Sequence, residues 1–228
     1  MKKLISNFLI KKGFRRLRKQ IKKLGKLSSI ETIDFLYSKK AELIQPWQFN
    51  NELAQLAKAI EELNPKVVVE IGTANGGTLF MSTRLADDNA LIVSIDLPGG
   101  EFGGGYPEWK VPIYKSFART GQKIELIRGN SHADETFKKL KRVLNDRQID
   151  YLFIDGDHTY EGAKMDFEKY GQLVRKGGKV AFHDIVVHKG SECDVFKLWN
   201  EVKTEYESRE FVNDWGQNCF GIGLIEIP

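Results

Sequence analysis

From residue 50 onward, the hydrophobic residues switch repeatedly between the helical period of 3.6 residues and short runs of consecutive apolar residues. Runs typical of buried parallel strands cover 67–71, 91–95, 124–127, 151–154 and 180–183, and helical patterns cover 51–63, 76–86, 111–118, 133–144, 159–174 and 195–206. Segment 220–227 alternates large apolar side chains with glycine or glutamate, as a further strand does. Strands that alternate with helices predict an α/β fold.

The first 28 residues follow a different pattern, with an apolar stripe at helical spacing and Lys or Arg at most other positions. The stripe consists of Ile10, Phe14, Leu17, Ile21 and Leu24. The apolar run at the start is too short and too broken for a signal peptide or a membrane span. We therefore expect a basic amphipathic helical arm over 1–28, a connecting helical segment over 29–44 and one domain over 45–228.

Charge is divided unevenly along the chain. The arm holds eleven Lys or Arg and no acidic residue, whereas the remaining 200 residues hold 24 basic against 31 acidic side chains, a net charge of −7. An anionic partner therefore suits the arm alone. We consider an anionic membrane surface, another subunit of a homo-oligomer, or a nucleic-acid backbone. Nucleic acid is the least favoured, because only Phe14 interleaves the basic residues with an aromatic ring.

Composition narrows the class of protein. With 41% hydrophobic and 29% charged residues, the 228-residue chain is typical of a globular protein and excludes collagen-like, wholly disordered and multi-span membrane classes. Cys193 and Cys219 are too few and too unpatterned for a zinc ribbon or a redox motif, and we expect both to be small packed residues. We expect a reducing, cytoplasmic setting, with peripheral membrane contact through the arm.

Candidate chemistry gathers where the predicted strands end, because ligands of open α/β sheets bind beyond the carboxyl ends of the strands. The first strand runs into 70–78, EIGTANGGT, whose glycines allow a tight turn and close approach of a ligand at the start of a helix. Asp96 ends the second strand, where a carboxylate can accept both hydroxyls of a ribose. Polar runs at 129–132 and 155–158 follow the third and fourth strands.

The amino-acid sequence of the glycine turn distinguishes between a dinucleotide and a sulfonium cofactor. Residues 72–77 read GTANGG and lack the second glycine of the GxGxxG dinucleotide fingerprint. Glu70 adds a negative charge that repels a pyrophosphate but suits the cationic methionine portion of S-adenosylmethionine (SAM). SAM is therefore the favoured cofactor, and an NAD-dependent oxidoreductase is the less favoured alternative.

Three stretches carry a family resemblance: 67–78, VVVEIGTANGGT; the strand that ends in Asp96; and 151–185, YLFIDGDHTYEGAKMDFEKYGQLVRKGGKVAFHDI. They resemble the class I SAM-dependent methyltransferases, and within them the branch related to cephalosporin-hydroxylase-like and sugar O-methyltransferases. The resemblance covers roughly residues 45–227. It implies a Rossmann-like, doubly wound, mostly parallel seven-stranded sheet with an antiparallel C-terminal strand, and makes 45–228 the methyltransferase domain.

The resemblance also implies which residues bind the cofactor. The aminoacyl part of SAM is expected against Gly72, Thr73, Asn75 and Gly76, the ribose at Asp96, and the adenine near Asn130 and Ser131. Glu70 joins this set through its charge.

Acidic and histidine residues follow two strands that we expect to be neighbours, with Asp155 and His158 after one and His183 and Asp184 after the other. Hard oxygen ligands suit Mg²⁺, and imidazole shifts the preference towards Mn²⁺ or Fe²⁺. The resemblance to metal-dependent relatives implies Asp155, His183 and Asp184 as ligands of a divalent cation, although His183 stands where such relatives often carry an acid.

A second interpretation of the same run involves no metal. Asp157 or Thr159 would then cap the helix that begins near Tyr160, and Asp155 would bond only to backbone amides or to SAM.

Methyl transfer requires an acceptor oxygen in line with the sulfonium carbon, exclusion of water and removal of one proton. We expect His158 or His183 to take the proton and Asp155 to assist through the cation. The glycine-rich segment 97–109 is expected to close over the reactants. The predicted activity is O-methylation of a sugar, glycolipid or other hydroxylated small molecule or glycan. The alternative from another class is a membrane-recruited SAM-binding module without turnover.

Overall fold

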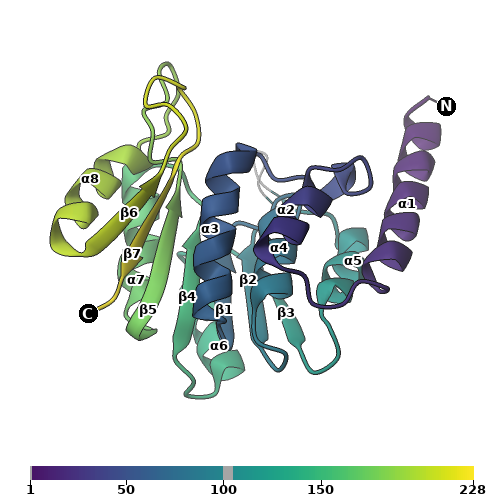
Figure 1. The fold of residues 1–228 in the computed structure, drawn as a ribbon, viewed down its shortest axis with the longest axis horizontal. Coiled ribbons are helices and arrows are strands. Elements are labelled where there is room, and N and C mark those ends of the chain that lie inside the picture. The colour runs from purple at the N-terminus through teal and green to yellow at the C-terminus, as the bar shows by residue number, and fades with distance from the viewer. Residues whose placement is uncertain (1, 100–104) are drawn as a thin grey trace.

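The structure is a computed structural model and describes residues 2–99 and 105–228. Its described strands form one sheet in the order β3-β2-β1-β4-β5-β7-β6 (Figure 1). The strands are β1 Val67–Ile71, β2 Leu91–Asp96, β3 Lys123–Arg128, β4 Ile149–Ile154, β5 Val174–His183, β6 Glu207–Phe211 and β7 Ile222–Glu226. Strand β7 pairs antiparallel with both β5 and β6, and the other pairings between the described strands are parallel. This confirms the predicted mostly parallel sheet with a reversed C-terminal strand.

Helices cover both faces of the sheet (Figure 1). They are α1 Lys2–Ile21, α2 Ser29–Leu36, α3 Asn50–Leu63, α4 Gly77–Leu85, α5 Val111–Tyr114, α6 Asp134–Leu144, α7 Tyr160–Gly171 and α8 Val195–Glu205, with short 3₁₀ turns at Glu42–Ile44, Glu108–Lys110 and Lys115–Phe117. Side chains of α1 to α5 share one core with one face of the sheet, and those of α6 to α8 share a second core with the other. Alternate residues of β1 divide between them, since Val68 enters the first and Val69 the second.

Three elements differ from the sequence expectation. The helix expected over 111–118 is a single α-helical turn followed by a 3₁₀ turn. Strand β5 starts at Val174, six residues early, and β6 was not anticipated. The added residues are mostly polar, and they pair through backbone hydrogen bonds that hydrophobic periodicity does not record.

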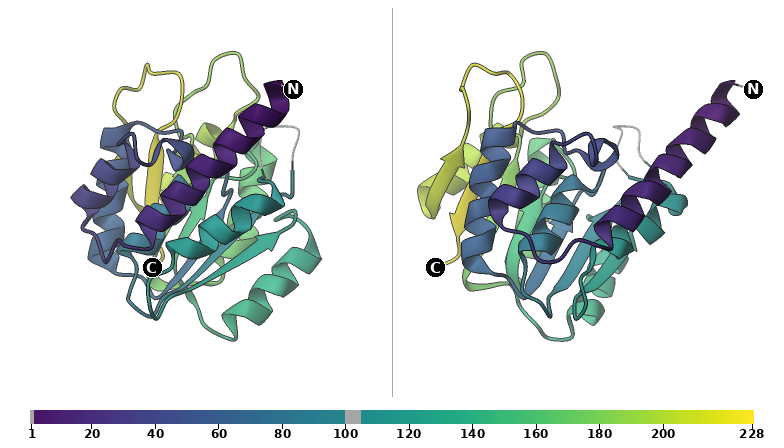
Figure 2. Two further views of the ribbon diagram at one scale, coloured as in Figure 1. Left: turned by 90° about the vertical axis from the view of Figure 1, so that its right-hand side faces the viewer. Right: turned by 45° about the vertical axis from the view of Figure 1, so that its right-hand side comes forward.

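The apolar stripe of the arm packs against the body, the domain over residues 45–228. Phe14, Leu17 and Ile21 are at most 3% exposed and belong to the first core, whereas Ile10 is 39% exposed. The ring of Phe14 meets that of Trp109 edge to face, with centroids 5.0 Å apart. The N-terminal part of α1 projects past the body (Figure 2). No described helix is long and apolar enough to cross a bilayer.

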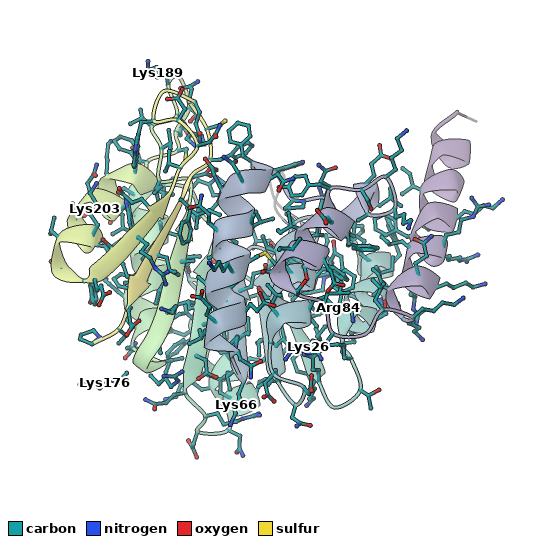
Figure 3. The ribbon with its side chains drawn as sticks, viewed as in Figure 1. Lys26, Lys66, Arg84, Lys176, Lys189 and Lys203 are labelled. Carbon is teal, nitrogen blue, oxygen red and sulfur yellow. The ribbon has the colours of Figure 1, made fainter. Side chains whose placement is uncertain are left out.

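Arg84 of α4 holds the C-terminal end of the arm. Its side chain is buried and donates hydrogen bonds to the carbonyl oxygens of Ile21, Leu24 and Gly25 at 2.9 to 3.2 Å (Figure 3). The carbonyl of Ile21 lies at the end of α1 and those of Leu24 and Gly25 lie just beyond it, where backbone acceptors lack helical partners. A cation at this end also complements the helix dipole.

Candidate active site

A cavity of about 660 Å³ opens at the carboxyl edge of the sheet, within the size range of small-molecule sites. Residues that follow β1, β2, β3, β4 and β5 line it, which is the edge indicated by the sequence. Every predicted site residue except Glu70 contributes: Gly72, Thr73, Asn75, Gly76, Asp96, Asn130, Ser131, Asp155, His158, His183 and Asp184.

The glycine turn after β1 needs its glycines at two positions. Gly72 has φ +93°, and a Cβ atom there would lie 1.9 Å from the carbonyl oxygen of Asp155. Gly76 has φ +84°, and a Cβ atom would lie 2.6 Å from the ring of Tyr114. Both positions favour glycine for conformation and for space. The turn thereby lies directly against the end of β4.

Asp96 anchors this turn from the end of β2. One carboxylate oxygen accepts the N–H groups of Thr73 and Ala74 at 2.9 and 3.0 Å. The other accepts those of Leu97 and Gly105 at 2.7 and 2.9 Å. Burial raises the pKa of Asp96, and these four donors partly offset the rise.

The predicted lid 97–109 is described only at its two ends, because residues 100–104 lie outside the described residues. Arg128 at the end of β3 donates hydrogen bonds to the carbonyl oxygens of Pro98 and Tyr106. Together with the bond from Gly105 to Asp96, these contacts tie both ends of the segment to the sheet beside the cavity.

Glu70 does not line the cavity. It is 1% exposed and lies behind the turn, where it accepts hydrogen bonds from the hydroxyls of Thr78 and Ser94. Burial raises its pKa to about 8, because the charged form loses solvation that two hydroxyls do not replace. Its partner Thr78 does reach the cavity wall.

Asn130 and Ser131 form the cavity wall after β3. The side-chain oxygen of Asn130 accepts the N–H of His132 at 2.9 Å, and the hydroxyl of Tyr170 donates to the carbonyl oxygen of Ser131 at 2.6 Å. These bonds fix the turn at the place where the resemblance expects the adenine.

Asp155, His158, His183 and Asp184 converge at one end of the cavity. His183 Nδ1 lies 3.1 Å from Asp155 Oδ1 and 3.1 Å from Asp184 Oδ1. His158 Nδ1 lies 3.1 Å from Asp184 Oδ2, and its Nε2 lies 3.5 Å from Asp155 Oδ1. Asp184 has φ +61°, a strained conformation for a residue with a side chain.

The cluster shifts the pKa values of its members. Burial alone would lower the pKa of His183, but Asp155 and Asp184 raise it well above its usual range. The hydrogen bond to Asp155, then that to Cys193, raise the pKa of His158 to about 10. Burial opposes the shift of Asp155 and of Asp184, yet the neighbouring histidines lower both pKa values. The two carboxylates therefore hold positive charge between them.

The donor set fits a divalent cation. A ring nitrogen of His183 and one carboxylate oxygen each of Asp155 and Asp184 lie within 4.8 Å of one another. His183 Nδ1 and Asp184 Oδ1 are buried and make no well-aligned hydrogen bond with any described residue. Buried polar atoms rarely go unpaired, and a bound cation would satisfy both.

The helix cap that the sequence predicts at Asp157 or Thr159 is also present, and it involves neither Asp155 nor the histidines. Thr159 is the N-cap of α7, with its hydroxyl accepting the N–H of Gly162 at 3.0 Å. Asp157 in turn accepts the N–H of Thr159 at 2.9 Å. Asp157 and Thr159 thus serve the helix, whereas Asp155 faces the histidines.

A family model described as a methyltransferase domain matches residues 69–185, just over half of the chain. The chain belongs to this methyltransferase family. The uncharacterized protein R132 of Acanthamoeba polyphaga mimivirus is 32% identical over 161 residues, which are 70% of this chain and 68% of R132. The uncharacterized protein y4gI of Sinorhizobium fredii is 27% identical over 156 residues, which are 67% of this chain and 16% of y4gI.

Among solved structures, an O-methyltransferase from Bacillus cereus in complex with SAH matches with a TM-score of 0.56 at 16% identity. The match covers 86% of this chain and 90% of that one. It shows that this methyltransferase has the class I methyltransferase fold.

The cavity of this methyltransferase is acidic. Asp96, Asp155, Asp157, Asp184 and Glu192 line it, and no Lys or Arg is among its described lining residues. At the glycine turn a pyrophosphate group would meet Asp96 and no Lys or Arg, whereas a sulfonium and an ammonium group would meet favourable charge. The electrostatics therefore fit SAM better than a dinucleotide.

At the acid and histidine end of the methyltransferase site, sequence reasoning missed four residues. Gln48, His188 and Cys193 line the cavity, and Glu52 lies behind Gln48. His188 Nε2 lies 3.1 Å from Asp184 Oδ1, and the proximity of His188 to His183 in the sequence offered a weak signal. Gln48 and Glu52 precede the matched region, and no local motif marks them.

Proposed function

We propose that this methyltransferase transfers the methyl group of SAM to a hydroxyl oxygen of a sugar, glycolipid or other hydroxylated small molecule, with the help of a divalent cation. The acidic cavity over a glycine turn, free of Lys and Arg among its described lining residues, carries this proposal. In the reaction the S–CH₃ bond breaks, an O–CH₃ bond forms and the hydroxyl proton passes to a base.

The cofactor half of the site is assigned to the turn after β1 and its neighbours. Gly72 and Gly76 let the backbone approach the ligand closely, and Asn75 lies on the same cavity wall. Asp96 is assigned to the ribose and 130–131 to the adenine. Glu70 acts from behind, by holding Thr78 and Ser94.

Asp155, His183 and Asp184 would hold the cation, with Mg²⁺, Mn²⁺ and Fe²⁺ as candidates. When bound, the cation would grip acceptor oxygens and lower the pKa of the reacting hydroxyl. The burial of His183 and Asp184 at this end of the cavity limits the access of water.

His158 is the assigned base. Its side chain is 46% exposed and lines the cavity, whereas that of His183 is 9% exposed. With a pKa of about 10, His158 carries a proton at neutral pH while Asp155 and Asp184 are unneutralised. It would accept a proton when a bound cation offsets the charge of these carboxylates.

The acceptor half is assigned to the cavity mouth. Trp47 lines the cavity and is nevertheless 68% exposed, so its indole presents a face to an incoming molecule. Phe220 adds a second ring. Aromatic faces stack on sugar rings and on aromatic acceptors, while the cluster of acids and histidines binds hydroxyl groups.

Calorimetric titration of the full chain with SAM, S-adenosylhomocysteine (SAH) and NAD tests the cofactor. The proposal expects micromolar binding of SAM and SAH and no binding of NAD.

SAH release is then followed with a panel of sugars, glycolipids and catechols, with Mn²⁺ or with EDTA. Asp184→Asn should retain SAM binding and lose turnover. Binding of NAD, or full turnover by Asp184→Asn, would refute the proposal. Binding of SAM without turnover on any acceptor of the panel would favour the alternative, a SAM-binding module that does not catalyse methyl transfer.

A further inference from the structure

The side chain of Gln48 reaches the acid and histidine cluster from the segment before α3. Its Oε1 lies 3.0 Å from His183 Nε2, and both residues are at most 8% exposed. The hydroxyl of Tyr37 donates to the carbonyl oxygen of Gln48 at 2.6 Å, which fixes the backbone at this point. Gln48 lies outside the family match at 69–185.

Glu52 determines which way the Gln48 amide faces. Glu52 is fully buried and accepts the amide nitrogen of Gln48 at 2.7 Å. It also accepts the N–H groups of Asn213 and Gly221 and the side-chain amide of Gln217. Four donors occupy its four lone-pair sites, so it accepts and does not donate. The NH₂ group of Gln48 therefore faces Glu52, and its oxygen faces His183.

An amide oxygen only accepts hydrogen bonds, so Nε2 of His183 must be the donor in this contact. The remaining nitrogen, Nδ1, faces Asp155 Oδ1 and Asp184 Oδ1 at 3.1 Å. We infer that Gln48 and Glu52 are a positioning pair that holds His183 as its Nε2–H tautomer and presents Nδ1 as a metal ligand. Metal-binding histidines are commonly oriented by such a contact on the other ring nitrogen.

This inference rests on the metal site of the proposed function and decides a role left open by the sequence. His183 then binds the cation and does not remove the proton, which leaves His158 as the base. It also links the cluster to the loop 212–221, because the same Glu52 holds three groups of that loop.

The test compares Gln48→Leu with Gln55→Leu, a control on the exposed side of α3. Mn²⁺ affinity is measured by electron paramagnetic resonance, SAH affinity by calorimetry, and the tautomer of His183 by long-range ¹⁵N NMR of the Zn²⁺-loaded chain. We expect about a 10- to 100-fold loss of Mn²⁺ affinity in Gln48→Leu, unchanged SAH affinity, and a protonated Nε2 in the wild type. The control should match the wild type.

Unchanged Mn²⁺ affinity in Gln48→Leu, or a metal-bound Nε2, would overturn the positioning role while leaving the proposed function intact. A wild-type chain that binds SAH but no metal would refute the metal site itself, and this role with it.

A second inference concerns the outer face of α1. Its stripe is covered by the body, so the basic residues of α1 and of the segment directly after it point outward: Lys11, Lys12, Arg15, Arg16, Lys19, Lys22, Lys23 and Lys26 are all exposed. No ion pair joins them to an acidic side chain of the described residues. The helix projects beyond the body, and the sequence of this part contains five large apolar residues between positions 4 and 10 (Figure 2).

We propose that this face adsorbs on an anionic membrane surface while the stripe stays docked on the body. Insertion of the stripe itself would require Phe14, Leu17 and Ile21 to leave the core. Basic residues near an anionic leaflet bind through charge, and nearby apolar residues reinforce them.

Flotation with phosphatidylcholine vesicles, with and without phosphatidylglycerol, tests this surface. The variant reverses Lys12, Arg16, Lys19 and Lys23 to Glu; the control reverses the exposed Lys138, Lys139, Lys141 and Arg142 of α6. We expect at least tenfold weaker binding to anionic vesicles for the arm variant, no loss for the control, and loss of binding in 0.5 M salt. Equal loss in both variants, or tighter binding to duplex DNA than to vesicles, would overturn the proposal.

Discussion

The backbone of Gly72 and the carbonyl oxygen of Asp155 are packed so closely that a Cβ atom on residue 72 would lie 1.9 Å from that oxygen. This contact joins the glycine turn to the strand end that carries Asp155 of the acid and histidine cluster. The two halves of the site are thus positioned by one another.

Gly72→Ala should therefore damage both halves. The clash and the positive φ predict a loss of about 2 kcal/mol or more in the free energy of unfolding, together with weaker SAH binding. Urea denaturation and calorimetry measure the two effects. Gly25→Ala is the control, because a Cβ atom there would contact nothing within 4 Å. If Gly72→Ala loses no more free energy of unfolding than Gly25→Ala, then backbone movement relieves the close approach at Gly72.

Asp96→Asn should weaken the binding of SAH at least tenfold. Asn offers one acceptor oxygen, so two of the four backbone N–H groups at this side chain lose their partner, at a cost of about 1 to 3 kcal/mol in stability. A 2′-deoxy analogue of SAH separates this structural effect from a contact with the ribose. If Asp96 binds the ribose, the analogue loses affinity for the wild type but not for Asp96→Asn. If the analogue loses the same affinity for the wild type and for Asp96→Asn, then Asp96 only holds the glycine turn and does not contact the ribose.

Glu70→Gln should change the pH dependence of stability. The pKa of Glu70 is about 8 in the fold against 4.5 for a free side chain, so the native state binds the extra proton between these values. Its contribution is fully present below pH 4.5 and is lost as pH rises to about 8, by up to about 5 kcal/mol. Gln has no proton to lose, so the variant should gain stability relative to the wild type from pH 5 to 9. Urea unfolding across this range checks it; a constant difference would show that Glu70 ionises normally.

Arg84→Met should release the arm without emptying the core. Methionine fills much of the same space but cannot donate to the three carbonyl oxygens at the end of α1. We expect a loss of about 2 to 4 kcal/mol and faster tryptic cleavage within residues 11–26. Arg142→Met on the exposed face of α6 is the control. Unchanged cleavage would show that burial of Phe14, Leu17 and Ile21 alone holds the arm.

Strand ends and turn residues were predictable because their signals are local. The apolar β-branched run at 67–71 coincides with β1, and the glycines after it predicted a tight turn, which the structure forms with positive φ at Gly72 and Gly76. Parallel strands end at one edge, so the side chains after β4 and β5 had to meet there, as Asp155 and His183 do at 3.1 Å. Glu70 was misplaced because it precedes the last residue of β1, and side chains of a strand alternate between its faces.

The sequence by itself determined the α/β class, the edge of the sheet that carries the chemistry and the amphipathic character of the arm, since periodicity and strand ends depend on neighbouring residues. Only the tertiary structure decided that Gln48, held by Glu52, contacts a histidine 135 residues later, and that Arg84 and Trp109 cover the end and stripe of the arm. An apolar stripe in the sequence indicates that one face of a helix is buried. Which segment covers that face depends on packing between residues that are distant in the sequence. The same holds for the buried side-chain amide of Gln48, because the fold brings its hydrogen-bond partners to it from other segments.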